Sequence, residues 1–120
     1  MLITNEKDIE RQKFSGHGGI GVMKMRFAFT DHQYYGNNND AKWNCFAIAE
    51  IPVGATAGKH KHKDTDEIFY ILEGEATMII DNERSKIRKG DIILTKIRSV
   101  HDIVEVKKKL KFIVIEIFRK

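Results

Sequence analysis

The sequence has very little cysteine or proline. Its single cysteine, Cys45, excludes an internal disulfide, which is compatible with a reducing compartment. Because Cys45 stands in an apolar run, WNCFAIAEI, we expect it to be a small buried core residue. There is one proline, Pro52, and no Ser/Gly-rich linker or low-complexity tract, so nothing marks a domain boundary. A chain of 120 residues suits one compact domain.

Long hydrophobic runs are also missing. Crossing a bilayer takes about 20 apolar residues, whereas the longest apolar stretches, such as residues 112–118, have the length of a strand, and Glu116 interrupts that one. Residues 1–14, MLITNEKDIERQKF, are charged and lack the apolar centre of a secretory signal. We therefore expect a cytoplasmic protein with no membrane partner.

The charge balance is basic, with a net charge of +4 and an isoelectric point near 9.2. Lysines gather in residues 59–63 and 107–111, and we interpret Lys107–Lys109 as the solvated tip of a hairpin. No helix-turn-helix, zinc finger or aromatic RNA-binding signature accompanies them, so we expect no nucleic-acid partner. The positive balance favours steering of a small anionic ligand.

Short alternating segments separated by turn residues fill most of the chain. Between Val22 and Phe29, for example, large apolar side chains alternate with Lys24, Arg26 and Ala28, as on a strand. Residues 31–42 are rich in Asn and indicate a loop. Weak helical signals are confined to residues 5–13. The expected strands cover residues 22–29, 43–51, 55–63, 67–72, 76–80, 84–88, 91–94, 100–106 and 110–118.

This pattern predicts an all-β protein, with two sheets folded against each other as a jelly-roll β-barrel. We expect one domain over residues 1–120, with an N-terminal arm over about residues 1–21 and the barrel over about 22–118.

The segment GATAGKHKHKDTDEIFYILEG, residues 54–74, carries the chemistry. His60 and His62 are two residues apart, so on a strand they share one face. Four residues then suffice for a turn, and Glu67 opens the next strand, where its carboxylate can lie opposite the two imidazoles. Phe69 shares the face of Glu67 and would give the site an apolar floor. A second segment, GDIILTKIRSVHDIVE, residues 90–105, supplies a third imidazole from His101.

Three imidazole nitrogens and one carboxylate oxygen suit a divalent transition metal, namely Fe, Mn, Ni, Co, Zn or Cu. Mg²⁺ and Ca²⁺ prefer shells of oxygen alone. Four protein ligands on an ion that accepts about six leave open positions for water, a ligand or O₂, as in catalytic sites.

The first segment resembles the first cupin motif in full, with Gly54, the two histidines, Glu67 and Gly74 at the spacing of that family. The second resembles the second cupin motif less well. Gly90 and His101 fit, but three positions depart from it: Lys96 replaces a usual proline, Arg98 a usual glycine and Glu105 a usual asparagine.

The resemblance implies a cupin-type double-stranded β-helix and one metal ion on His60, His62, Glu67 and His101. Cupins include dioxygenases, decarboxylases, isomerases, epimerases and plain binding proteins, so the fold and metal follow more firmly than the reaction.

Two functional hypotheses follow from this resemblance. The first is a metal-dependent enzyme acting on a small polar or anionic metabolite, such as a keto acid or a sugar acid, by oxygenation, decarboxylation or isomerisation. Glu67 would then detach from the metal and serve as a base. The second is a non-catalytic metal- or small-ligand-binding module, for example a sensor. We also expect a homodimer paired through the outer sheet, to which the N-terminal MLIT segment could add a strand.

Other residues are weaker candidates for substrate binding. Arg26 is either a solvated arginine of a sheet face or, if that face lines the barrel, a bidentate partner for a substrate carboxylate. His17, in SGHGGIG, is either a loop residue or an acid/base group at the barrel mouth. Tyr34 and Tyr35 lie in the long loop and are either interface or surface residues or part of a lid over the site.

On the strand of Glu67, Tyr70 and Leu72 lie on the opposite face, so we interpret them as sheet packing or a dimer contact.

Overall fold

The computed structural model describes residues 1, 3–14, 18–29 and 43–119, and the side chains from Cys45 onwards in the last range. It is almost entirely β. Among these residues no helix is long and apolar enough to cross a membrane. The elements are a 3-10 helix η1 (Glu6–Asp8) and strands β1 (Gln12–Phe14), β2 (Met23–Ala28), β3 (Trp43–Ile51), β4 (His60–Lys61), β5 (Thr65–Ile80), β6 (Glu83–Arg88), β7 (Ile92–Thr95) and β8 (Val100–Phe118).

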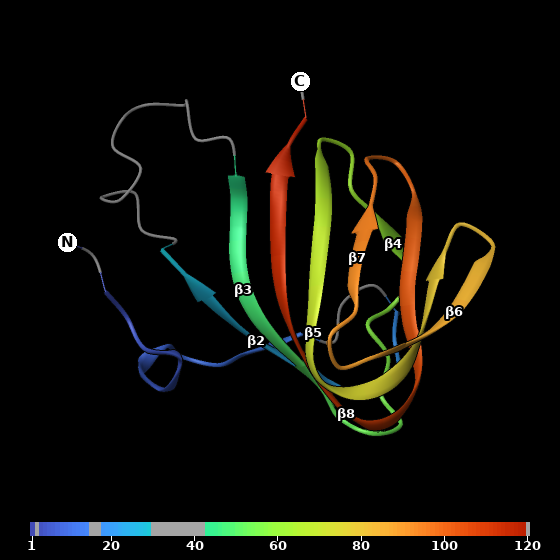
Figure 1. Cartoon of the computed structure of the whole chain (residues 1–120), viewed down its shortest axis with the longest axis horizontal. Coiled ribbons are helices and arrows are strands. Elements are labelled where there is room, and N and C mark those ends of the chain that lie inside the picture. Colours follow the sequence, from blue (N-terminus) through green and yellow to red (C-terminus); the bar gives the residue numbers. More distant parts are fainter. Residues whose placement is uncertain (2, 15–17, 30–42, 120) are drawn as a thin grey trace.

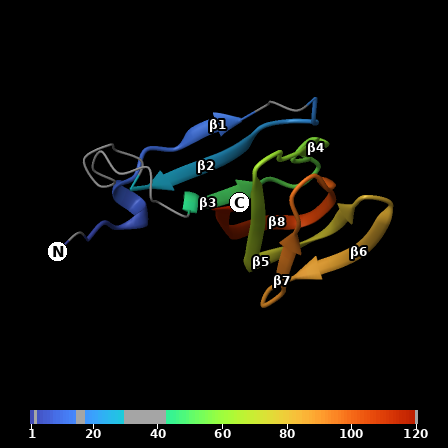
Figure 2. The same cartoon turned by 90° about the horizontal axis from the view of Figure 1, so that it is seen from above.

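The strands pair antiparallel in the order β1-β2-β3-β8-β5-β6, with β4 added to β8 and β7 added to β5. The long strands β5 and β8 curve through the whole molecule. As a result β1, β2 and β3 lie on one side and β6 and β7 on the other (Figures 1 and 2). The all-β jelly-roll prediction is therefore confirmed.

Two of the expected turns are parts of continuous strands. We predicted a break at Glu73–Gly74 and a hairpin tip at Lys107–Lys109, but β5 and β8 run through both. The pairing of β5 with β8 shifts register three times between Ile71 and Thr77. Such bulges bend a strand and increase its twist without ending it. The three lysines are exposed, as expected, but they lie on the bend of β8.

The bend also changes which face of β8 points inward. His101 and Ile103 are buried before the bend, whereas Leu110, Phe112 and Val114 are buried after it. The inward positions thus change from odd to even numbers. Glu105, between the two phases, has a φ of +51° and marks the irregularity.

The core fills the space between the two halves of the sheet. Alternate residues of the central strands β3, β5 and β8 point into it, as period-two burial requires. Its members are buried, and the largest hydrophobic side chains that are fully buried are Phe112, Ile51, Ile71, Ile103 and Leu110.

The N-terminal arm is less helical than predicted. Of residues 5–13 only η1 is helical, and the Asn5 side chain caps it by accepting a hydrogen bond from the Lys7 amide at 3.1 Å. Residues 12–14 pair with β2 instead. The strand expected over residues 55–63 is reduced to β4. The amides of Thr56 and Ala57 donate hydrogen bonds to the carbonyls of Ile20 and Ile103, and these bonds are not part of a β-ladder.

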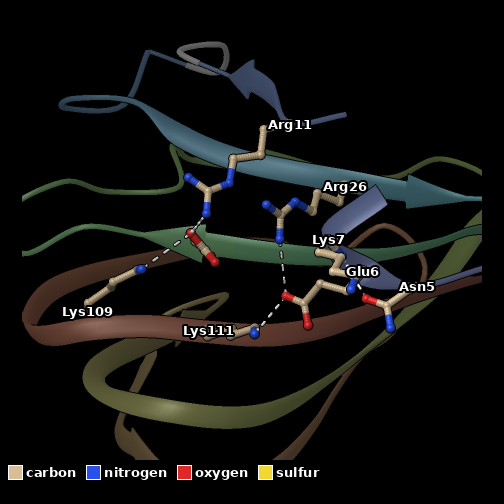
Figure 3. A network of polar contacts seen from close by, with 8 residues as sticks. Asn5, Glu6, Lys7, Arg11, Arg26, Lys109 and Lys111 are labelled. Atoms are coloured by element: carbon tan, nitrogen blue, oxygen red, sulfur yellow. Dashed lines mark hydrogen bonds and ion pairs between the residues drawn. The ribbon is translucent and has the colours of Figure 1, made fainter. Parts of the chain in front are cut away.

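Ion pairs fasten this arm to the outer face of the sheet (Figure 3). The Glu6 carboxylate lies 2.7 Å from Lys111 Nζ and 3.3 Å from the Arg26 guanidinium. Glu50, on β3, is held in the same way between Arg11 and Lys109. The arm thus docks through charge, and the sheet face beneath it is polar.

Candidate metal centre

Four side chains predicted as metal ligands meet at one point. His60 comes from β4, His101 from β8 and Glu67 from β5, while His62 follows β4 directly. The register pairs His60 with His101 across two strands, which brings their rings together. One potential ligand atom from each of the four side chains lies within 4.8 Å of the others. The cluster is half-buried to buried, and Glu67 and His101 are only 4% and 1% exposed.

The distances between these atoms fit a shared ion. His101 Nε2 is 2.7 Å from His60 Nε2 and 3.3 Å from Glu67 Oε1, and His62 Nε2 is 3.2 Å from Glu67 Oε2. Ligand atoms bound at about 2.1 Å and at right angles lie about 3.0 Å apart. The buried Glu67 Oε1 has no hydrogen-bond partner in the described part of the chain. Such an atom needs a partner, and a cation would provide one.

Neighbouring backbone groups orient the histidines. His60 Nδ1 lies 2.8 Å from the Gly58 carbonyl oxygen, so we assign it the proton, which leaves the Nε2 lone pair facing the centre. The Gly58 amide in turn donates to Asp102 Oδ1 at 2.9 Å. The Arg98 amide donates to the His62 carbonyl at 2.9 Å. The contact of His60 with Gly58 is of the kind that fixes the tautomer and direction of a metal-binding imidazole, and the contact with Arg98 holds the backbone of His62.

Burial and mutual contact shift the proton affinities of the cluster. Burial raises the pKa of Glu67 to about 7, and the Glu116 side chain also raises it, whereas His62 opposes the shift. Contact with the Glu67 carboxylate raises the pKa of His62, against the effect of burial. Protons therefore compete with any incoming cation for Glu67 and His62.

A cavity of about 240 Å³ opens beside the cluster. Its polar lining consists of His60, His62, Glu67, Glu116 and the Cys45 thiol. The rest of its wall is apolar and is formed by Phe14, Met23, Met25, Phe27, Ala57, Phe69, Ile103, Phe112 and Val114. Open coordination positions on a bound ion would therefore face a small and largely apolar chamber.

The remaining predicted residues have different locations. Phe69 lines the cavity, and its ring centroid is 5.9 Å from that of His101, so the apolar floor is present. Arg26 alternates with the cavity-lining Met25 and Phe27, and its guanidinium pairs with Glu6 on the other face of the sheet.

Three further candidates, His17, Tyr34 and Tyr35, lie outside the described residues. Tyr70 is exposed and Leu72 half-buried on the outer face.

Sequence reasoning missed Glu116 as a site residue. Its carboxylate lines the cavity, and its Oε1 atom lies 3.5 Å from His62 Nε2. A signal was present: Glu116 interrupts an apolar run in the same phase as Phe112 and Val114, which are buried. A carboxylate at an inward position of a strand indicates a site, because burying an unpaired charge is costly.

Cys45 is buried, as expected, although it lies on the cavity wall. Burial and the nearby carboxylates of Glu116 and Glu67 raise the pKa of its thiol to about 12. The neutral thiol is a poor ligand and nucleophile, so the cluster relies on nitrogen and oxygen.

Comparison with known proteins agrees with this geometry. The family model of the cupin domain matches residues 47–118, which is more than half of the chain. The chain belongs to the cupin family. The cupin resemblance seen in the two motifs is thereby confirmed, and the match covers all four clustered side chains.

Among similar proteins, an oxalate-binding protein of Thermotoga maritima is 27% identical over 103 residues, covering 85% of this chain and 81% of that protein. An uncharacterised protein of Methanocaldococcus jannaschii is 44% identical over 57 residues, covering 48% of this cupin and 46% of its relative. A crystal structure of a predicted oxalate decarboxylase from T. maritima superposes with a TM-score of 0.85 and 27% identity, over 98% of this chain and 100% of that one.

The backbone is left-handed at two departures from the second cupin motif. Arg98, where cupins usually have glycine, has a φ of +68°, and Glu105, where they usually have asparagine, has a φ of +51°. Glycine adopts this left-handed region freely, and asparagine does so more readily than most residues. At both positions this cupin has a left-handed backbone on a residue that tolerates it less well.

Proposed function

We propose that this cupin is a metal-dependent enzyme that acts on a small anionic metabolite, such as a keto acid or a sugar acid. One observation supports the proposal above all: three imidazoles and one carboxylate converge beside a cavity whose wall is largely apolar. His60, His62, Glu67 and His101 would hold one divalent ion of Fe, Mn, Ni, Co, Zn or Cu. A bound ion would polarise a carbonyl or carboxylate of the ligand and stabilise charge that develops there.

The protein's own residues would bind and orient the metabolite. The apolar wall around Phe69 excludes water, which strengthens electrostatic contacts at the reacting atoms. Glu67 combines metal binding with an oxygen base, and we assign to it the transfer of a proton. Oxygenation, decarboxylation and isomerisation all use a ligand held in this way.

Binding without turnover is the second candidate function. It is favoured by the relative that is named an oxalate-binding protein and aligns with most of this chain. The two functions share the metal centre and differ in chemistry. To separate the two functions, metal-loaded protein is incubated with a panel of keto and hydroxy acids. O₂ uptake, CO₂ release and proton NMR spectra are then followed. If the parent turns a ligand over and Glu67→Gln does not, the result supports the enzyme. If a ligand binds saturably but is recovered unchanged, the result supports the binding module.

Metal analysis tests the centre itself. We expect protein purified without an affinity tag or added metal to hold close to one equivalent of a transition metal. His60→Ala and His101→Ala should each lose most of it. His17→Ala serves as the control, since His17 is outside the proposed set. If both variants retain the metal of the parent, the ligand assignment is wrong.

We also propose that the protein is a cytoplasmic homodimer. The outer face of β5, β7 and β8 carries large apolar side chains, with Tyr70, Ile92 and Leu94 exposed by 43%, 71% and 52%. The register places Tyr70 beside Ile92, so the patch is contiguous and suits a self-complementary contact. Sedimentation should show a dimer at micromolar concentration, and a double Ile92→Lys, Leu94→Lys variant should sediment as a monomer. A monomeric parent protein would reject the dimer.

A further inference from the structure

A second carboxylate stands beside the candidate metal centre without belonging to the four-residue cluster. Glu116, on β8, is paired in register with Glu67 on β5. Its Oε1 atom lies 3.5 Å from His62 Nε2, and its side chain lines the same cavity. The carboxylate is therefore placed where a ligand on the open positions of an ion would meet it.

The charge of the cavity is unusual for a site that takes anions. Its described lining contains two carboxylates, Glu67 and Glu116, and neither lysine nor arginine. Arg26, on β2, and Arg119, which follows β8, are engaged elsewhere, since Arg26 pairs with Glu6 and Arg119 with Asp66. A divalent ion with both carboxylates ionised forms a neutral centre. Such a centre tolerates one added negative charge far better than two.

We propose that Glu116 is a specificity-determining residue that selects small 2-hydroxy monocarboxylates over dicarboxylates such as oxalate. This inference rests on the metal centre of the proposed function. The ligand would chelate the ion through one carboxylate oxygen and its hydroxyl, and the hydroxyl would donate a hydrogen bond to Glu116. A charged acceptor makes that bond stronger than a neutral one. A dicarboxylate offers no proton there and places a second negative charge against Glu116, so it is repelled.

The size and lining of the cavity further restrict which ligands fit. Its volume of about 240 Å³ is below the range of roughly 300–1,000 Å³ that is usual for drug-sized ligands. Beyond the polar end, the wall is formed by apolar side chains including Met25, Phe27 and Phe69. The structure thus favours a short hydroxy acid that carries a small apolar substituent on its hydroxyl carbon.

Oxalate and glycolate form a matched pair of probes, because they differ in size by little and glycolate replaces one carboxylate with a hydroxymethyl group. Protein is loaded with one equivalent of Mn²⁺, desalted and checked for metal content, and the Kd of each probe is measured by calorimetry. The variant is Glu116→Gln, which keeps the shape and removes the charge. Glu50→Gln is the control, because Glu50 lies on the adjacent strand with its side chain 12% exposed, against 13% for Glu116, but outside the cavity.

In Glu116→Gln we expect the ratio of the oxalate Kd to the glycolate Kd to fall at least about tenfold relative to the parent. Glu50→Gln should leave the ratio within about twofold. The metal-free Glu116→Gln variant should remain folded, which its thermal unfolding curve checks, because glutamine keeps the shape of the side chain. Should this variant misfold, Glu116→Ala provides the same comparison.

The outcomes separate the two proposals. A metal-loaded Glu116→Gln protein with the parent's ratio overturns the role of Glu116 and leaves the metal centre standing. If neither probe binds the metal-loaded parent, both the role of Glu116 and the proposed class of ligand are wrong. A parent that retains no Mn²⁺, with His101→Ala behaving identically, overturns the metal centre and the inference together.

Discussion

Replacing Gly74 by alanine tests the packing that holds the two long strands together. Gly74 has a φ of +99°, and a Cβ atom there would lie 2.2 Å from the Lys109 carbonyl oxygen and 2.8 Å from Leu110 Cα. Side-chain carbons do not approach backbone atoms so closely, so β5 and β8 would have to separate at their bend. The left-handed conformation costs roughly 1–2 kcal/mol for a non-glycine residue, and the overlap adds about 1–3 kcal/mol. We expect the free energy of unfolding to fall by about 2–5 kcal/mol.

Gly54→Ala is the matched control, because Gly54 belongs to the same motif and also has a positive φ, +83°. A Cβ atom at Gly54, however, would have no atom of the described residues within 4 Å apart from those of its chain neighbours. The variant should lose only the conformational part, about 1–2 kcal/mol. Chemical denaturation followed by circular dichroism measures both values. If Gly74→Ala is no less stable than Gly54→Ala, the close approach of the strands at Gly74 is not what requires glycine there.

Four further results are expected. Arg98→Gly should stabilise the fold by about 0.5–1 kcal/mol in urea titration, because it relieves a φ of +68° at some cost in unfolded-state entropy. Contacts with Lys111 and Arg26 lower the pKa of Glu6. The stabilising effect of Glu6 is therefore present above its ordinary pKa and is lost as the pH falls through the lowered value. The melting temperature of Glu6→Gln should lie below that of the parent at pH 7 and converge with it in acid. Saturating metal at about 100 times its Kd should stabilise the parent by about 2.7 kcal/mol in thermal scans, and a chelator should reverse this. Because the Cys45 thiol has a pKa of about 12, a thiol reagent should label the protein in denaturant and scarcely at all in the native state.

Much of the fold was predictable because hydrophobic alternation and turn residues are local signals. The alternation in residues 22–29 and 43–51 corresponds to β2 and β3, and Asp81–Asn82 does separate β5 from β6. The bends of β5 and β8 were not predictable in this way. Glu73–Gly74 and Lys107–Lys109 carry the composition of turns, but their backbone amides and carbonyls stay near a partner strand because the two bends match each other. That match is a tertiary property.

The candidate site shows the same division. Spacing was enough to propose that His60, His62, Glu67 and His101 converge, because two of them share a strand segment and the family pattern supplies the others. The place of Arg26 depended on which face of β2 turns inward, and alternation alone could not decide that. Glu116 was missed because its partner Glu67 lies far away in sequence, and only the pairing of β5 with β8 puts them in one cavity.

The irregularity at Glu105 has a consequence for how this chain tolerates insertions and deletions. His101 and Glu116 are separated by an odd number of positions, so a perfectly regular strand would turn one of them toward solvent. The irregularity at Glu105 lets residues near both ends of β8 place their side chains at the candidate metal centre. Removing one residue between Glu105 and Leu110, or adding one, should therefore leave a sheet that still pairs while aiming either the imidazole or the carboxylate outward.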